Sequence, residues 1–303
     1  MSRPDAPAVP GHIVVATDFS PSADAAIVRG ESLAARLGAR LSLLHVVEPL
    51  PLVSGWGDAG AVAWIGLEAL QSAGLQQLER QRDAHPALAG REVSLHCLVG
   101  HARRDLGPLA AGLGADLLLL GGRAPATFGD RLLGSTARAV VHGCPVPLLV
   151  CGRSGAAPWQ RVVAAADFSA AAERAIGLAD VLAPAATKRF VHAHRGIPEA
   201  TLALVQPDPA ALQRYTAEAE QEALARFAAL QRRHPDWIGH FRRGEASDVV
   251  EAEAITQQAD LVALGTRGHG RWLGGLLGSV GQRLLARIDA DILLVPQTTA
   301  DDA

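Results

Sequence analysis

The chain has 303 residues, of which 49% are hydrophobic and 19% charged, so it can form two domains of about 150 residues, each with its own core. The formal net charge is −3 and the basic residues are scattered, which argues against a nucleic-acid partner held on a basic face. No apolar stretch is long enough to cross a membrane and the N-terminus lacks an apolar leader, so we expect a cytoplasmic protein without a membrane partner.

In the first half of the chain, continuously apolar runs alternate with helical patterns. Strands are predicted at 12–17, 40–47, 91–99, 115–120 and 146–151, and helices at 22–37, 66–84, 102–112 and 133–142. Because the apolar runs do not alternate with polar residues, both faces of the sheet are expected to be covered by helices. Residues 51–70 are hard to interpret and fit either an ordered loop or a mobile flap over a site.

The second half of the chain repeats the first. An apolar run, Asp-Phe-Ser, a helical stretch and a second apolar run with His occur from His12 and again from Gln160. A period this long indicates duplicated domains, because solenoid repeats are far shorter. Gly, Ser and Pro cluster in "CGRSGAAPWQ" (151–160), so we expect a first repeat at 1–154 and a second at 155–303. The predicted fold class is α/β: two doubly wound domains, each a five-stranded parallel sheet flanked by helices.

The second repeat also contains a strong amphipathic helix. Asp208 is its expected N-cap and Pro209 its first residue. Four apolar side chains at helical spacing are expected to belong to the core: Leu212, Ala219, Leu224 and Phe227.

Asp18 and Asp167 end the first strand of each repeat, and a glycine-rich loop follows the fourth strand. In open α/β sheets, ligands bind beyond the carboxyl ends of the strands. The loop "GTRGHGRWLGGLLGS" (265–279) leads into a helix whose N-terminal N–H groups favour an anion. Its glycines at 265, 268 and 278 are expected to adopt positive φ and let the backbone approach a phosphate. A carboxylate at the end of the first strand suits a pair of ribose hydroxyls.

Simpler interpretations remain open for these residues. Gly-Ser before a helix is ordinary capping in most proteins, and no Walker A motif is present. Ser20 and Ser169 are read as N-caps of the first helices, with Pro21 at N1. His45 and His192 occupy matching positions at the end of the second strand, where a packed or site-lining imidazole is favoured over a catalytic one. The spacing of the cysteines and histidines predicts no metal site.

The spacing Gly265-x2-Gly268-x9-Gly278-Ser279, with Ala-Asp-Phe-Ser upstream, resembles the nucleotide-binding signature of the universal stress protein family. The resemblance covers both repeats and implies a tandem universal stress protein that binds ATP, with or without Mg²⁺, and serves stress tolerance. In the second repeat, the positions matching the family's nucleotide-binding residues, with the neighbouring Arg267, are Asp167, Ala193, Gly265, Arg267, Gly268, Gly278 and Ser279. In the first repeat, the weaker matches are Asp18, Val46, Gly121, Gly134 and Ser135.

The first repeat departs from this pattern within its loop. Ala124, Pro125 and Asp130 stand where the second repeat has Gly268, His269 and Gly274. An alanine forced into positive φ costs about 1–2 kcal/mol. Proline removes an N–H donor, and the aspartate adds negative charge near an anion. We therefore predict that the second repeat holds most of the nucleotide and that the first site is degenerate.

Function and assembly follow as expectations. The leading prediction is an ATP-binding stress or regulatory protein without catalytic residues, in which any ATP hydrolysis is slow. The alternatives are a ligand-independent interaction scaffold of the same fold, and an ATP-hydrolysing or adenylate-forming enzyme. The last strand of each repeat is apolar and predicted to lie at a sheet edge. The family resemblance implies pairing through this strand, hence an intramolecular pseudo-dimer, with further self-association left open.

Overall fold

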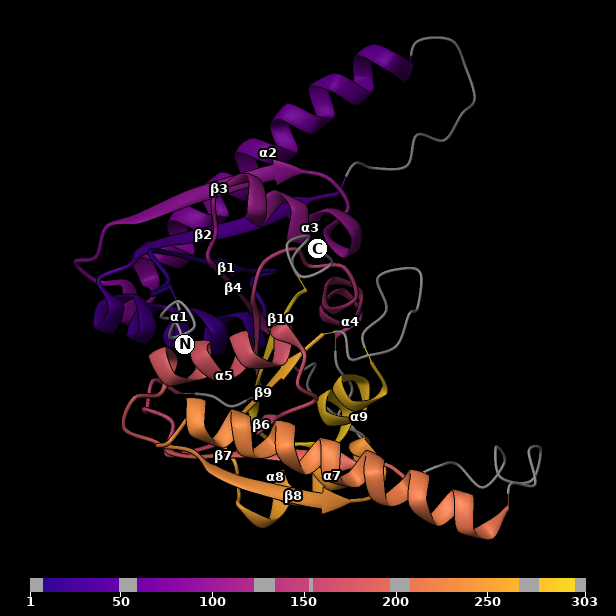
Figure 1. The fold of residues 1–303 in the computed structure, drawn as a ribbon. Helices are drawn as coiled ribbons and strands as arrows, with labels where there is room; N and C mark the ends of the chain where they lie inside the picture. The colour runs from indigo at the N-terminus through magenta and orange to yellow at the C-terminus, as the bar shows by residue number, and fades with distance from the viewer. Residues whose placement is uncertain are drawn as a thin grey trace. The chain divides into compact units, whose positions relative to one another are not determined.

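The computed structural model describes residues 8–48, 59–122, 134–152, 155–196, 208–266 and 278–297, and all statements below concern these residues. They form two compact units, with Val9–Ala157 as the first repeat and Pro158 onward as the second. Figure 1 shows the elements of each repeat, coloured along the chain.

The first repeat is a five-stranded parallel sheet with helices packed on it. Its elements are β1 (His12–Ala16), α1 (Pro21–Leu37), β2 (Arg40–Val47), α2 (Ala59–Ala84), a 3-10 turn (Pro86–Leu88), β3 (Val93–Val99), α3 (Ala102–Gly112), β4 (Leu117–Gly121), α4 (Ser135–Val141) and β5 (Leu148–Cys151). The strand order is β3-β2-β1-β4-β5. The order reverses at β1, so β1 and β4 flank the switch point where ligands bind in such sheets.

The second repeat has the same architecture. Its elements are β6 (Arg161–Ala165), α5 (Ala170–Leu182), β7 (Thr187–His194), α7 (Pro209–Arg233), β8 (Ile238–Arg243), α8 (Ala246–Thr256), β9 (Leu261–Gly265), α9 (Ser279–Arg287) and β10 (Asp291–Val295). The strands again pair in parallel, in the order β8-β7-β6-β9-β10. The predicted fold class, a doubly wound α/β domain occurring twice, is confirmed.

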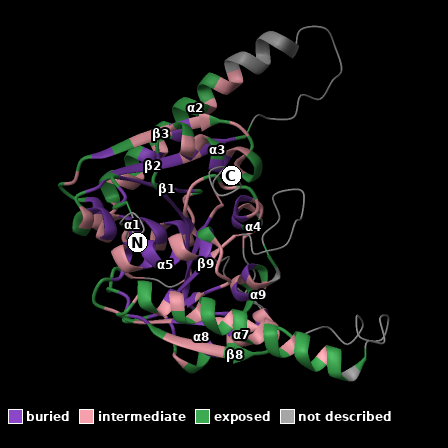
Figure 2. Cartoon of the chain, in the orientation of Figure 1, coloured by how far each residue is buried: buried purple, intermediate pink, exposed green. Residues whose placement is uncertain are grey.

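The core of each repeat lies on its central strands. Ile13, Val14 and Val15 of β1 have no exposed surface, nor have Val163 and Ala164 of β6. Figure 2 shows this buried layer in purple and the exposed outer faces of α2 and α7 in green. Burial on both faces explains why the strands are continuously apolar, because helices cover the sheet on each side.

Helix α1 shows how local sequence sets the bounds of an element. Ser20 caps it by accepting a hydrogen bond from the Ala23 N–H at 3.3 Å, and Pro21 occupies the first turn. Gly38 ends the helix in the left-handed conformation with φ 67°. Ser169 caps α5 in the same way, through the Ala172 N–H at 3.1 Å. The N-cap interpretation of both serines is therefore confirmed.

The sequence-predicted strands and most helices agree with the structure to within about two residues, and one helix differs more. Helix α2 begins at Ala59, seven residues before the predicted start, so the second part of the stretch 51–70 is helical. Positions 51–58 lie outside the described residues.

The expectation that Leu224 belongs to the core is wrong, because 44% of its surface is exposed. Leu212, Ala219 and Phe227 are half-buried. Phe227 contacts the ring of Phe190 in β7, so the sheet-facing side of α7 runs through Phe227 and Leu230 and leaves Leu224 on the outer side. The N-terminal half of α7 extends past the end of the sheet, as Figure 1 shows. Leu230, one turn from the C-terminal end, is fully buried.

Three findings concern membrane contact, the cysteines and metal binding. No described helix combines the length and the apolar character needed to span a membrane. Cys97, Cys144 and Cys151 are free thiols, and burial raises the pKa of Cys144 to about 11. Within the described part of the chain, no three metal-ligating side chains gather in one place.

Candidate functional site

Asp18 and Asp167 stand just beyond the ends of β1 and β6, as predicted. One carboxylate oxygen of each accepts a hydrogen bond from the backbone N–H two residues on, at 3.1 Å from Ser20 and 2.9 Å from Ser169. The other oxygen of each has no hydrogen-bond partner among the described residues. Each carboxylate thus stabilises its own turn with one oxygen and leaves the other without a partner among the described residues.

The phenylalanine after each aspartate is in a strained conformation that the sequence did not reveal. Phe19 and Phe168 both have φ 64°, in the left-handed region where a non-glycine residue is uncommon. Their rings contact those of His45 and His192, with centroids 4.5 Å and 4.2 Å apart. Such pairs contribute about 0.5–1.5 kcal/mol, which offsets much of the backbone strain.

The ring nitrogens of the two histidines also support the turn. Nδ1 of His45 donates to the carbonyl of Thr17 at 2.9 Å, and Nδ1 of His192 donates to the carbonyl of Ala166 at 2.7 Å. Each of these carbonyls belongs to the residue just before the aspartate. Burial lowers the pKa of His192, which keeps its ring neutral. The predicted site-lining interpretation holds for His45, which borders the pocket described below.

Gly121 and Gly265 are required for packing, and the expectation of positive φ at Gly265 is wrong. A Cβ on Gly121 would lie 2.4 Å from the carbonyl carbon and oxygen of Ser22 in α1. A Cβ on Gly265 would lie 2.9 Å from Cβ of Ala171 and from N of Ala172 in α5. These glycines let the strand end approach the first turn of the helix that follows Asp-Phe-Ser, and so bring the two halves of the site together.

Gly134 and Gly278 differ from that pair. They precede α4 and α9 with ordinary φ values of −53° and −59°, so positive φ is also wrong for Gly278. An added Cβ at either position would meet no described atom within 4 Å, and neither helix has a side-chain cap. The described part of the fold does not demand glycine here, and the free N–H groups of the first turn suit an anion.

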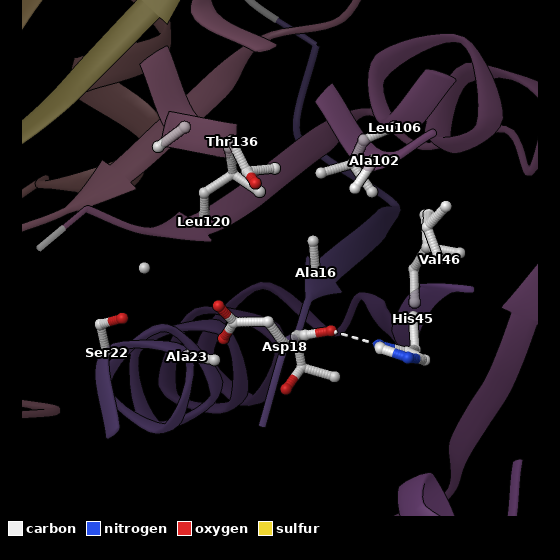
Figure 3. A pocket seen from close by; sticks show the side chains of 14 residues that line it. Ala16, Asp18, Ser22, Ala23, His45, Val46, Ala102, Leu106, Leu120 and Thr136 are labelled. Atoms are coloured by element: carbon white, nitrogen blue, oxygen red, sulfur yellow. Dashed lines mark hydrogen bonds between the residues drawn. The ribbon is translucent and has the colours of Figure 1, made fainter. Parts of the chain in front are cut away.

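A pocket with an open volume of about 540 Å³ lies at the carboxyl ends of β1, β2 and β4 in the first repeat. Figure 3 shows the carboxylate of Asp18 and the hydroxyl of Thr136 on opposite sides of it, with Val46 beside His45. Among the predicted residues, Asp18, Val46 and Gly121 line this pocket, whereas Gly134 is not among its lining residues. The lining residues Ala102 and Leu106 of α3 were not foreseen.

In the second repeat the structure brings three predicted residues to neighbouring strand ends. Asp167 follows β6, Ala193 lies near the end of β7 and Gly265 ends β9, and β6 pairs with both other strands. Gly278 and Ser279 stand at the start of α9. Arg267, Gly268 and Arg271 lie outside the described residues, as do Ala124, Pro125 and Asp130 of the first repeat.

An ion-pair cluster next to α9 was missed by sequence reasoning. Arg283 of α9 pairs with Glu251 and, at 2.6 Å, with Asp248, both on α8, and Arg287 pairs with Glu251 at 3.2 Å. Asp248 and Glu251 are three residues apart and Arg283 and Arg287 four, so each pair shares one helix face. This complementary spacing of acids and arginines was the feature of the sequence from which the ion pairs could have been predicted. The ion pairs link α8 to α9, the helix whose N-terminus is the candidate phosphate site.

Comparison with known proteins identifies the family. The family model "Universal stress protein family" matches twice, at residues 11–152 and 158–296. The chain belongs to the universal stress protein family. A universal stress protein of Mycolicibacterium smegmatis is 28% identical over 295 residues, which cover 93% of this chain and 96% of that protein. Universal stress protein A homolog 1 of Coxiella burnetii is 31% identical over 136 residues, 43% of this chain and 88% of that protein.

Solved structures support the fold over almost the full length. The crystal structure of a universal stress protein from Archaeoglobus fulgidus has a TM-score of 0.64 at 16% identity, covering 95% of this chain and 99% of that one. A putative universal stress protein from Pseudomonas aeruginosa has a TM-score of 0.55 at 16% identity, covering 95% of this chain and 93% of that one. The protein is thus a tandem universal stress protein in fold.

Proposed function

We propose that this universal stress protein is a cytoplasmic regulatory protein that binds ATP, mainly through its second repeat. The proposal is carried by the convergence of Asp167, Ala193 and Gly265 at three neighbouring strand ends, of which β9 is the strand that precedes α9 in the chain. The segment that joins β9 to α9 is the glycine-rich loop whose spacing matches the family's nucleotide-binding signature.

Each part of this site has a role in the proposal. The oxygen of Asp167 that has no protein partner would accept hydrogen bonds from ribose hydroxyls. Ala193 has a short side chain that leaves room for the adenine ring, and the N–H groups at the start of α9 would hold phosphate oxygens. No described atom lies within 4 Å of a Cβ placed on Gly278, which fits this role because a phosphate could approach the backbone there without meeting a Cβ. Mg²⁺ would enter with the phosphates of the nucleotide.

The first repeat is proposed to bind the nucleotide more weakly. Its pocket supplies the surface for adenosine, with Asp18 and Val46 at the same places as Asp167 and Ala193. Its phosphate loop carries Ala124, Pro125 and Asp130, which remove backbone freedom, an N–H donor and positive potential. The distinction between the repeats therefore concerns phosphate more than adenosine.

Binding rather than turnover is proposed, because the residues assigned to the site supply contacts and no general base. The rival functions are a ligand-independent scaffold and a slow ATP-hydrolysing enzyme. Mass spectrometry of small molecules released from the heat-denatured protein distinguishes ATP binding from the scaffold function, because a ligand-independent scaffold should release no nucleotide. Phosphate released from ATP, measured over hours, distinguishes simple binding from slow hydrolysis, because only the enzyme should release phosphate.

A paired substitution tests the site itself. Replacing Gly278 and Ser279 together by leucine should abolish ATP binding in calorimetry, because bulky side chains would fill the approach to the α9 N-terminus. The matched control replaces Gly134 and Ser135 by leucine and should leave most of the binding in place. Unchanged ATP affinity in a folded Gly278→Leu/Ser279→Leu protein would refute the proposed site.

We further propose that the two repeats form a pseudo-dimer within one chain. In their own strand orders, β5 and β10 lie at an edge of each repeat, and both are apolar. An apolar edge strand tends to pair with another strand. The family resemblance implies pairing through this strand.

A further inference from the structure

A second pocket in the first repeat shares no lining residue with the pocket of Figure 3. It has about 920 Å³ of open space, including solvent at its mouth. It lies between the Asp-Phe-Ser turn, α1 and the C-terminal part of α2, and its lining residues are Phe19, Asp24, Gln77, Arg80, Gln81, Ala84, His85 and Pro86. Aromatic, acidic, amide and basic groups therefore meet in one cavity.

A chain of hydrogen bonds fixes one wall of this pocket. Oγ1 of Thr17 donates to Oε1 of Gln81 at 3.0 Å, and Nε2 of Gln81 donates to Oδ1 of Asp24 at 2.9 Å. The second carboxylate oxygen of Asp24 has no partner among the described residues. Nδ1 of His85 is buried and likewise lacks a hydrogen-bond partner in the described part of the chain. The wall of the cavity therefore holds an oriented acid, Asp24, with one carboxylate oxygen left without a described partner.

The second repeat fills the same place with its own side chains. The guanidinium of Arg226 on α7 lies over the ring of Phe168, with Cζ 4.9 Å from the centroid. Arg233, two turns further along α7, forms an ion pair with Glu173 of α5. Phe168 is the equivalent of Phe19, with the same φ and the same contact to a histidine ring. One guanidinium group thus covers the aromatic ring, and a second pairs with the acidic side chain near the turn.

The first repeat keeps the aromatic ring and the acid but lacks both cations. Asp24 stands at the position of Glu173, whereas Gln77 and Ala84 replace Arg226 and Arg233 in the helix that covers the turn. We propose that the pocket binds a small zwitterion bearing a guanidinium group, of which free arginine is the simplest example. Its guanidinium would lie over Phe19 and beside Asp24, as Arg226 and Arg233 do over the equivalent ring and acid.

Arg80 indicates which second charged group the ligand carries. It lines the same pocket and is exposed, and its Nε donates to the carbonyl of Gln76 in its own helix at 3.3 Å. No salt-bridge partner of Arg80 occurs among the described residues. A carboxylate on the ligand would pair with this guanidinium at the rim, which favours a zwitterion over a pure cation.

Calorimetric titration of the full chain with L-arginine tests the proposal, and we expect one site per chain. Gln77→Arg places the cation of the second repeat into the first and should abolish arginine binding. The double variant Arg226→Gln/Arg233→Ala opens the equivalent place in the second repeat, where Ala229 stands at the position of Arg80, and should add a second, weaker site. Wild-type protein that binds no arginine, or a folded Gln77→Arg protein that binds it as well as wild type, would overturn the proposal.

Two further measurements test the proposed contacts of the ligand with Asp24 and Arg80. Asp24→Asn should weaken arginine binding about tenfold or more, whereas Asp24→Glu, which copies Glu173, should retain it. Agmatine lacks the carboxylate and should bind more weakly than arginine, and equal affinity would contradict the role of Arg80. ATP titration of the same variants should be unchanged, so a failure of the ATP proposal and a failure of this one are distinguishable.

Discussion

The two repeats build the same turn and surround it differently. In both, Asp-Phe-Ser follows the central strand, the phenylalanine has φ 64°, and a histidine on the neighbouring strand supports the ring. In the second repeat Arg226 and Arg233 cover that turn, and α8 and α9 are joined by ion pairs. In the first repeat Gln77 and Ala84 stand at the positions of these two arginines, and two pockets border the turn. Duplication has thus kept the turn that holds the aspartate and allowed its surroundings to diverge.

The largest expected effect concerns the relation between the repeats. Each repeat expressed alone should self-associate, because its apolar last strand, β5 or β10, would lack the partner that the pseudo-dimer supplies. Light scattering after size exclusion should give dimers or larger species for both halves. Monodisperse, folded, monomeric halves would contradict the pseudo-dimer.

A second expected effect separates packing glycines from site glycines. Gly121→Ala should lower the free energy of unfolding by about 1–3 kcal/mol, because the added Cβ would clash with backbone atoms of Ser22. Gly134→Ala should change it by less than about 0.5 kcal/mol, because its Cβ would meet no described atom within 4 Å. Urea unfolding of the two variants measures the difference. Equal destabilisation would show that the two kinds of glycine are not distinct.

The smallest expected effect is a pH dependence in the second repeat. Burial lowers the pKa of His192 below its ordinary value near 6.5, so between the lowered pKa and 6.5 the unfolded chain binds more protons than the folded one. The stability from this residue is complete above pH 6.5 and declines as the pH falls through that window. His192→Gln should flatten the slope of unfolding free energy between pH 7 and 5.5. A slope identical to that of wild type would contradict this assignment.

Most of the fold could be predicted from local sequence patterns. Apolar runs gave the strands, and the serine caps of α1 and α5 followed from residue types that act within one turn. The role of Gly121 was not predictable, because it depends on Ser22, which is distant in sequence and close only in the folded sheet. The same holds for Leu224, since which side of α7 packs on the sheet is a tertiary property. For the site, the sequence predicted which residues meet at the strand ends, but it did not reveal the strained turn of Phe19 and Phe168.

The central claim is that one repeat carries the functional nucleotide site, and ATP stoichiometry tests it most directly. Losing one charge-assisted hydrogen bond to phosphate costs about 1.5–3 kcal/mol, or roughly tenfold to a hundredfold in affinity, before any backbone strain is added. Titration calorimetry of the full chain should therefore give about one ATP per chain. The double substitution Ala124→Gly/Pro125→His should raise the count towards two. Two equal sites per wild-type chain would contradict the account.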